Sequence, residues 1–78
     1  MYTTDILLSS IEAVKKFVSL ANRYDFPINL RTDKYSIDAK SIMGVFSLDL
    51  SKPVTVELEG PQAEHFISQL TEFTPQNA

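Results

Sequence analysis

The sequence contains no cysteine, and its single histidine lies at position 65. Without cysteine, neither a disulfide framework nor a thiolate metal site can form, and small secreted domains usually need such cross-links for stability. The cytoplasm is therefore the expected compartment. The chain also has no metal-ligand cluster and no glycine-rich phosphate loop, so we predict no metal, no cofactor and no enzymatic activity of its own.

Long hydrophobic runs and clusters of basic residues are missing as well. No apolar stretch approaches the roughly 20 residues that span a bilayer, and nothing near Met1 has the form of an export signal. The seven Lys and Arg residues are scattered in a chain of net charge −3. The sequence therefore predicts neither membrane insertion nor nucleic-acid binding, because a phosphate backbone requires a basic surface.

The 78 residues are 44% hydrophobic and 22% charged, as in ordinary folded proteins. A chain of this length cannot build two separate cores, so residues 1–78 are expected to form a single domain. Residues 2–7 favour a first strand, although Asp5 interrupts the alternation. Residues 75–78 are predicted to be a frayed tail.

A first helix is predicted to follow, ending near Tyr24 before Pro27. Ser9-Ser10-Ile11-Glu12 has the form of a capping box, in which the Ser9 hydroxyl accepts a hydrogen bond from the Glu12 amide. Apolar residues at three- and four-residue spacing predict one buried face. These are Ile11, Val14, Phe17, Val18 and Ala21.

The rest of the chain alternates between strand and helix patterns. Residues 28–32 and 35–39 alternate apolar and polar residues around a turn at Asp33-Lys34, which predicts a hairpin. A short helical segment at 41–48 precedes a fourth strand at 54–58, and a last helix is expected to begin at Pro61. This order indicates an α+β fold with an antiparallel or mixed sheet covered by helices.

The segment Lys40-Ser41-Ile42-Met43-Gly44-Val45, followed by Ser47-Leu48, resembles the regulatory-serine segment of HPr, the histidine-containing phosphocarrier family of the bacterial sugar phosphotransferase system. The similarity extends over most of the chain. It implies an HPr-like open-faced β-sandwich, in which a four-stranded antiparallel sheet is covered on one face by three helices in the order βαββαβα.

Two departures from the family pattern lie at the start of the first helix. The family has a phosphorylatable histidine there, followed by an arginine and a proline. Ser10, Glu12 and Ala13 occupy the matching positions. His65 is too distant in sequence to replace that histidine, and it is expected to be a solvated helix residue.

Serine cannot replace histidine as a phosphoryl carrier, because a serine phosphate is a stable ester whereas the imidazole phosphate is labile. Glu12 also places a carboxylate where a guanidinium would neutralise phosphate. The resemblance therefore implies a family member that has lost phosphoryl relay and acts by protein–protein binding or regulation. The alternative functions are a residual phosphoacceptor that uses Ser10 or Ser41, and a structural module. The alternative role of Ser9 or Ser10 is to cap the first helix and do nothing further.

Ser41 resembles the serine that an ATP-dependent kinase phosphorylates in some HPr proteins. Its alternative role is to cap the short helix. By the same resemblance, Ile42, Met43 and Phe46 are candidates for a partner-binding patch, and the alternative is that they belong to the core. The implied partners are proteins of the sugar phosphotransferase system or a transcriptional or metabolic regulator.

Overall fold

The computed structural model describes residues 2–73. These residues form four strands, three α-helices and one 3-10 turn. In chain order the elements are β1 (Tyr2–Ile6), α1 (Ile11–Ala21), β2 (Ile28–Arg31), β3 (Ser36–Asp38), α2 (Ile42–Phe46), β4 (Val54–Leu58), α3 (Ala63–Ser68) and η1 (Thr71–Phe73). The predicted α+β class and βαββαβα order are confirmed.

The four strands form one antiparallel sheet in the order β1-β4-β2-β3. β4 lies at its centre, with Val56 opposite Thr4 of β1 on one side and Leu30 of β2 on the other. The predicted alternation in β4 is confirmed, because Val54, Val56 and Leu58 are buried while the residues between them are partly exposed.

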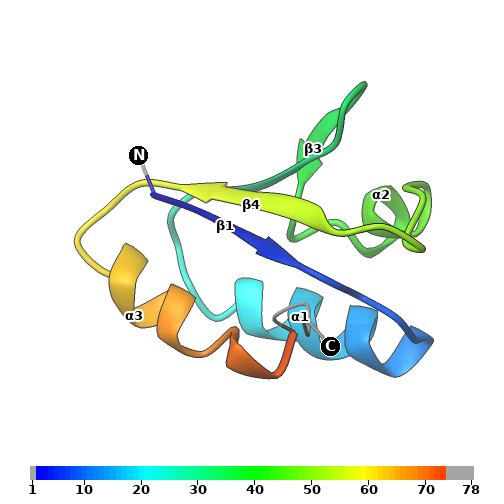
Figure 1. Cartoon of the computed structure of the whole chain (residues 1–78). Coiled ribbons are helices and arrows are strands. Elements are labelled where there is room, and N and C mark those ends of the chain that lie inside the picture. Colours follow the sequence, from blue (N-terminus) through cyan, green and yellow to red (C-terminus); the bar gives the residue numbers. More distant parts are fainter. Residues whose placement is uncertain (1, 74–78) are drawn as a thin grey trace.

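The helices cover one face of this sheet. In Figure 1, α1 and α3 lie beneath β1 and β4, while the tip of the β2–β3 hairpin projects on the far side. α2 lies toward the same end of the molecule as the first turn of α1. None of the helices in residues 2–73 is long and apolar enough to cross a bilayer.

The core lies between the sheet and the helices, and Phe17 of α1 is at its centre. The Phe17 ring makes edge-to-face contacts with Phe66 of α3, at a centroid distance of 6.3 Å, and with Phe73 of η1, at 6.0 Å. The Leu7 amide donates to the Phe73 carbonyl at 2.7 Å, which ties the end of β1 to η1. One aromatic side chain of α1 is therefore in contact with both α3 and η1.

The start of α1 differs from the prediction. Ser10, rather than Ser9, is the N-cap, so the predicted capping box between Ser9 and Glu12 is wrong. This places Ile11 at the first helical position, where its side chain is 64% exposed instead of buried. The other four residues of the predicted apolar face are buried as expected, and the helix ends at Ala21, before Tyr24.

The last helix is shorter than predicted. It begins at Ala63 rather than Pro61, and it stops at Ser68 before the chain continues into η1. The apolar residues that repeat at helical spacing in and after this helix nevertheless face the core: Ala63, Phe66, Leu70 and Phe73 are buried, and Ile67 is partly buried against them. The predicted tail at 75–78 lies outside the described residues.

Replacing Phe17 with alanine should lower the free energy of unfolding by about 3–5 kcal/mol, because it leaves a cavity between the helices and removes two ring contacts. Ile11→Ala is the matched control on the same helix, and its effect should stay within about 0.5 kcal/mol because the side chain is exposed. Urea unfolding followed by circular dichroism measures both. An equal loss in the two variants would contradict the assignment of the core.

Candidate functional site

Ser10 forms the N-cap of α1. Its backbone is extended, with φ −148° and ψ 162°, and its hydroxyl oxygen accepts a hydrogen bond from the Ala13 amide at 3.1 Å. The Ser10 carbonyl accepts the first bond of the helix from Val14, also at 3.1 Å. The Ser10 side chain is therefore used to complete the hydrogen bonding of a helix end.

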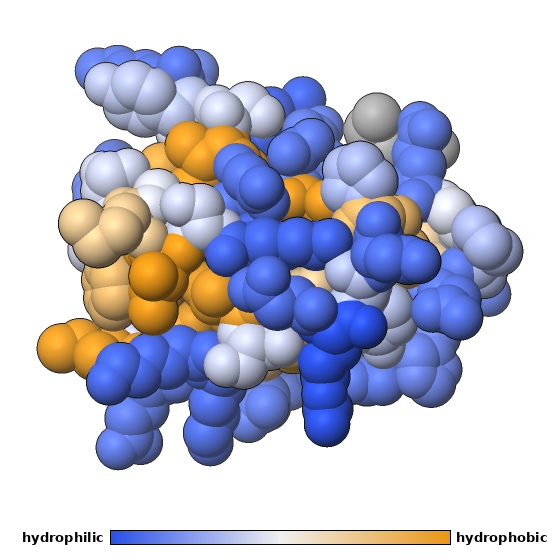
Figure 2. Space-filling view, turned by 180° about the vertical axis from the view of Figure 1, so that it is seen from behind, coloured by the Kyte–Doolittle hydropathy of each residue, from blue (hydrophilic) through white to orange (hydrophobic). Residues whose placement is uncertain are grey.

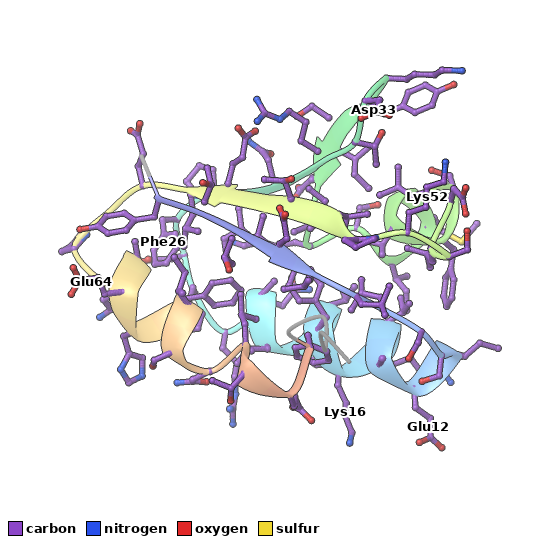
Figure 3. The ribbon with its side chains drawn as sticks, in the orientation of Figure 1. Glu12, Lys16, Phe26, Asp33, Lys52 and Glu64 are labelled. Atoms are coloured by element: carbon purple, nitrogen blue, oxygen red, sulfur yellow. The ribbon has the colours of Figure 1, made fainter. Side chains whose placement is uncertain are left out.

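Ala13 makes this cap possible. A proline at this position would carry no N–H and could donate nothing to the Ser10 hydroxyl. The cap thus requires both the hydroxyl of Ser10 and the amide of Ala13. Glu12 lies between them and points away from the sheet into solvent (Figure 3), where its carboxylate lies in the first turn of α1 and interacts favourably with the helix dipole.

His65 lies far from this cap. It belongs to α3, and its ring centroid is 6.3 Å from that of Tyr24, which follows the C-terminal end of α1. Its Nε2 is 2.8 Å from Nε2 of Gln69, whose amide also donates to the Tyr24 hydroxyl. The one histidine is therefore at the opposite end of α1 from Ser10.

Ser41 is the N-cap of α2, as the predicted alternative role requires. Its hydroxyl oxygen accepts a hydrogen bond from the Gly44 amide at 3.2 Å, and its side chain is exposed. The Ser41 carbonyl accepts from the Val45 amide at 3.0 Å. The hydroxyl is thus both a cap and accessible to another protein.

Asn22, which the sequence patterns did not single out, and Lys40, to which they gave no structural role, join α2 to α1. The Asn22 side-chain amide donates to the Val18 carbonyl at 2.9 Å and to the Lys40 carbonyl at 3.2 Å. The Lys40 ammonium donates to the Tyr24 carbonyl at 2.6 Å. The residue directly before Ser41 is therefore held at the C-terminal end of α1, where cations and donors are favoured.

Ile42, Met43 and Phe46 are exposed to 37%, 78% and 41%, and Val45 alone in α2 is buried. The alternative that Met43 belongs to the core is therefore wrong. Figure 2 shows hydrophobic side chains gathered at the end of the molecule where α2 and the start of α1 lie. Ile11 adds an apolar side chain to that end of α1, and its place at the first helical position is the signal that would have predicted its exposure.

An open cavity of about 810 Å³ lies between the β2–β3 hairpin and the connection from α2 to β4. Its lining carries both signs of charge, including Asp33 on the hairpin and Lys52 on the connection, which Figure 3 shows on the two sides. Asp49 also lines it, and hydrogen bonds from the hydroxyl and amide of Ser51 lower the pKa of that carboxyl. Three basic and two acidic side chains line the cavity in all, so its charge is mixed.

Within residues 2–73, no group of three or more histidine and acidic side chains could hold a metal ion. The described part of the chain has one salt bridge, between Arg31 and Glu57 at 3.0 Å, and it lies on the sheet rather than at either cap. The chemistry available at the two helix starts is therefore that of two serine hydroxyls, a neighbouring carboxylate and an apolar surface.

Comparison with protein families gives a match to the PTS HPr component phosphorylation site over residues 11–75. The matched region includes Ser41 and α2 and begins one residue after Ser10. Comparison with curated protein sequences gives no significant match.

Solved structures of the same fold include two HPr proteins and one relative. An HPr of Thermoanaerobacter tengcongensis is 28% identical, with a TM-score of 0.78 over 92% of this chain and 89% of that one. The phosphocarrier protein HPr of Bacillus anthracis is 26% identical, with a TM-score of 0.74 over 95% and 96%. The catabolite-repression protein Crh of Bacillus subtilis, a domain-swapped intertwined dimer, is 27% identical, with a TM-score of 0.67 over 91% and 88%.

Ser10→Ala should lower the free energy of unfolding by about 1 kcal/mol, because it leaves the Ala13 amide without its cap. Ala13→Pro removes the same hydrogen bond from the donor side. The double variant should lose much less than the sum of the two single losses, because both remove one interaction. A double-mutant cycle from urea unfolding measures this, and strictly additive losses would contradict the pairing.

Proposed function

The chain belongs to the HPr family, whose members are phosphocarriers rather than catalysts, and we propose that this member no longer relays phosphoryl groups but acts by binding other proteins. The observation that carries the proposal is the Ser10 hydroxyl bound to the Ala13 amide at 3.1 Å, at the position that matches the family's histidine. A capping hydroxyl replaces the ring that would carry the phosphate.

The chemistry of relay explains why this replacement matters. A carrier must accept a phosphoryl group and release it to the next protein, which requires a labile bond and a group that titrates near neutral pH. A phosphate on Ser10 would be a stable ester, and attaching it would disturb the acceptor that caps α1. The Glu12 carboxylate would also repel the incoming phosphate instead of neutralising it.

The proposed partner-binding patch consists of Ile42, Met43 and Phe46. These side chains are exposed on a helix that is anchored through Lys40 and Asn22 to α1, so the patch is presented by a fixed backbone. Exposed apolar side chains grouped on one surface are typical of protein-binding sites. Ser41 borders the patch, and a phosphate there would add about −1.5 to −2 charges beside it and change which partners bind.

The proposed partners are proteins of the sugar phosphotransferase system or a transcriptional or metabolic regulator in the cytoplasm. The similarity to Crh supports a regulatory role, since that protein is named for catabolite repression. The second candidate function is a residual phosphoacceptor, which the exposure of the Ser10 and Ser41 side chains favours. The two functions differ in the source of phosphate. A residual phosphoacceptor would receive it from the relay pathway, whereas the regulatory protein would receive it only from a kinase.

Incubation with phosphoenolpyruvate and the first enzyme of the phosphotransferase system should leave the protein unphosphorylated, because no imidazole is present at the start of α1. The triple variant Ser10→His, Glu12→Arg, Ala13→Pro should accept phosphate, since it restores the ring, the cation and the proline of the family pattern. Mass spectrometry of the intact proteins measures both. Phosphate found on Ser10 of the unaltered chain would refute the loss of relay.

A glutamate at Phe46 or Ile42 should reduce partner capture from the native cytoplasm by at least about tenfold, because burying a carboxylate in an apolar interface costs more than 1.4 kcal/mol. Tyr35→Glu is the matched control, since Tyr35 is 63% exposed on the hairpin, outside the patch. Ser41→Asp should change the set of captured proteins. Capture that is unchanged in all variants would count against the proposal. So would the failure of both the unaltered chain and Ser41→Asp to capture any protein.

A further inference from the structure

Gly44 lies in the middle of α2, where glycine is an unfavourable residue. Its greater backbone freedom makes it less stable than alanine inside a helix. Among residues 2–73 only Gly60 has a positive φ, so the backbone at position 44 does not require glycine. The reason for this glycine must therefore lie in the space around it.

That space is next to the Ser41 hydroxyl. A Cβ atom at position 44 would lie 3.3 Å from Ser41 Oγ, closer than side-chain carbons normally approach. Its other near neighbours, Ile37 Cδ1 and Ser41 Cβ, would be 3.5 Å away, which is ordinary van der Waals contact. An alanine at position 44 would therefore fit against Ile37 of β3, and only the Ser41 hydroxyl oxygen would be crowded.

The Ser41 backbone cannot easily move away to relieve this crowding. Its own amide donates to the Asp38 carbonyl at 3.1 Å, and the amide of Lys40 donates to the Asp38 carboxylate at 2.9 Å. The Lys40 carbonyl and ammonium are held by Asn22 and Tyr24. A side chain at position 44 would therefore have to be accommodated by a shift of the Ser41 hydroxyl of a few tenths of an ångström.

We propose that Gly44 is a specificity-determining residue for phosphorylation of Ser41, because the missing side chain keeps open the space beside Oγ that a phosphoryl group needs. The inference rests on the proposed regulatory role of Ser41. In the reaction, Oγ attacks the γ-phosphorus of ATP, the bond from that phosphorus to the bridging oxygen breaks, ADP leaves, and the hydroxyl proton passes to a base of the kinase. The three phosphoryl oxygens need more room around Oγ than the proton they replace.

The first experiment compares the unaltered chain with Gly44→Ala as substrates of a bacterial HPr kinase with ATP, followed by intact-mass spectrometry. The initial rate should fall by at least about tenfold in the variant, which corresponds to 1.36 kcal/mol in the barrier. The melting temperature of the unmodified variant should change by no more than about 3 °C, since the better helix residue offsets the crowding at the cap.

The second experiment needs no kinase. Phosphoserine is incorporated at position 41 during synthesis, and the melting temperature is measured with glycine and with alanine at position 44. Gly44→Ala should lower it by at least about 5 °C more in the phosphorylated protein than in the unmodified one. A residue needed only for packing would give equal shifts in both.

Equal melting shifts in the two backgrounds, or a loss of kinase rate below about threefold, would overturn the role of Gly44. Failure of the kinase to phosphorylate the unaltered chain at all would instead refute the proposed switch at Ser41. The phosphoserine proteins would then still decide whether position 44 has to remain without a side chain, so the two failures are distinguishable.

Discussion

The packing of Phe17 against Phe66 and Phe73 is the contact on which the rest of the molecule depends. A chain of 78 residues can build only a small core, and this ring joins α1, α3 and η1 within it. By fixing α1 against α3 and η1, it also fixes both ends of that helix. One end carries Ser10, and the other carries the hydrogen bonds that hold Lys40 and the start of α2.

The two helix caps use the same local chemistry in different surroundings. In each, a serine hydroxyl accepts from the amide three residues later, at 3.1 Å for Ser10 and 3.2 Å for Ser41. The Ser10 cap is followed by Glu12 and depends on the backbone amide of Ala13, which a proline would lack. The Ser41 cap is followed by apolar, exposed side chains and faces a glycine. The difference between the sites therefore lies in their neighbours rather than in the serines.

Much of the fold could be predicted from the sequence because β2, β3 and β4 follow a period of two. β4 was predicted with its observed limits, and the hairpin within one residue at each end. The cap of α1 could not be assigned, since Ser9 and Ser10 are adjacent and either can accept from an amide three residues on. Choosing Ser9 made Glu12 a capping-box partner. The spacing from Val14 placed Ile11 on the buried face, but Ile11 is the first residue of the helix and is exposed.

The candidate site was harder to predict than the fold because its geometry depends on contacts distant in sequence. Ser41 and the apolar residues of α2 could be found from their resemblance to a family segment, but Asn22 and Lys40 lie 18 residues apart and show no local pattern. Their hydrogen bonds decide how α2 meets α1. The exposure of Met43 likewise follows from burial of Val45 against the core, because a five-residue helix can turn only one narrow side inward. The surface that remains outside is the one that a partner would meet.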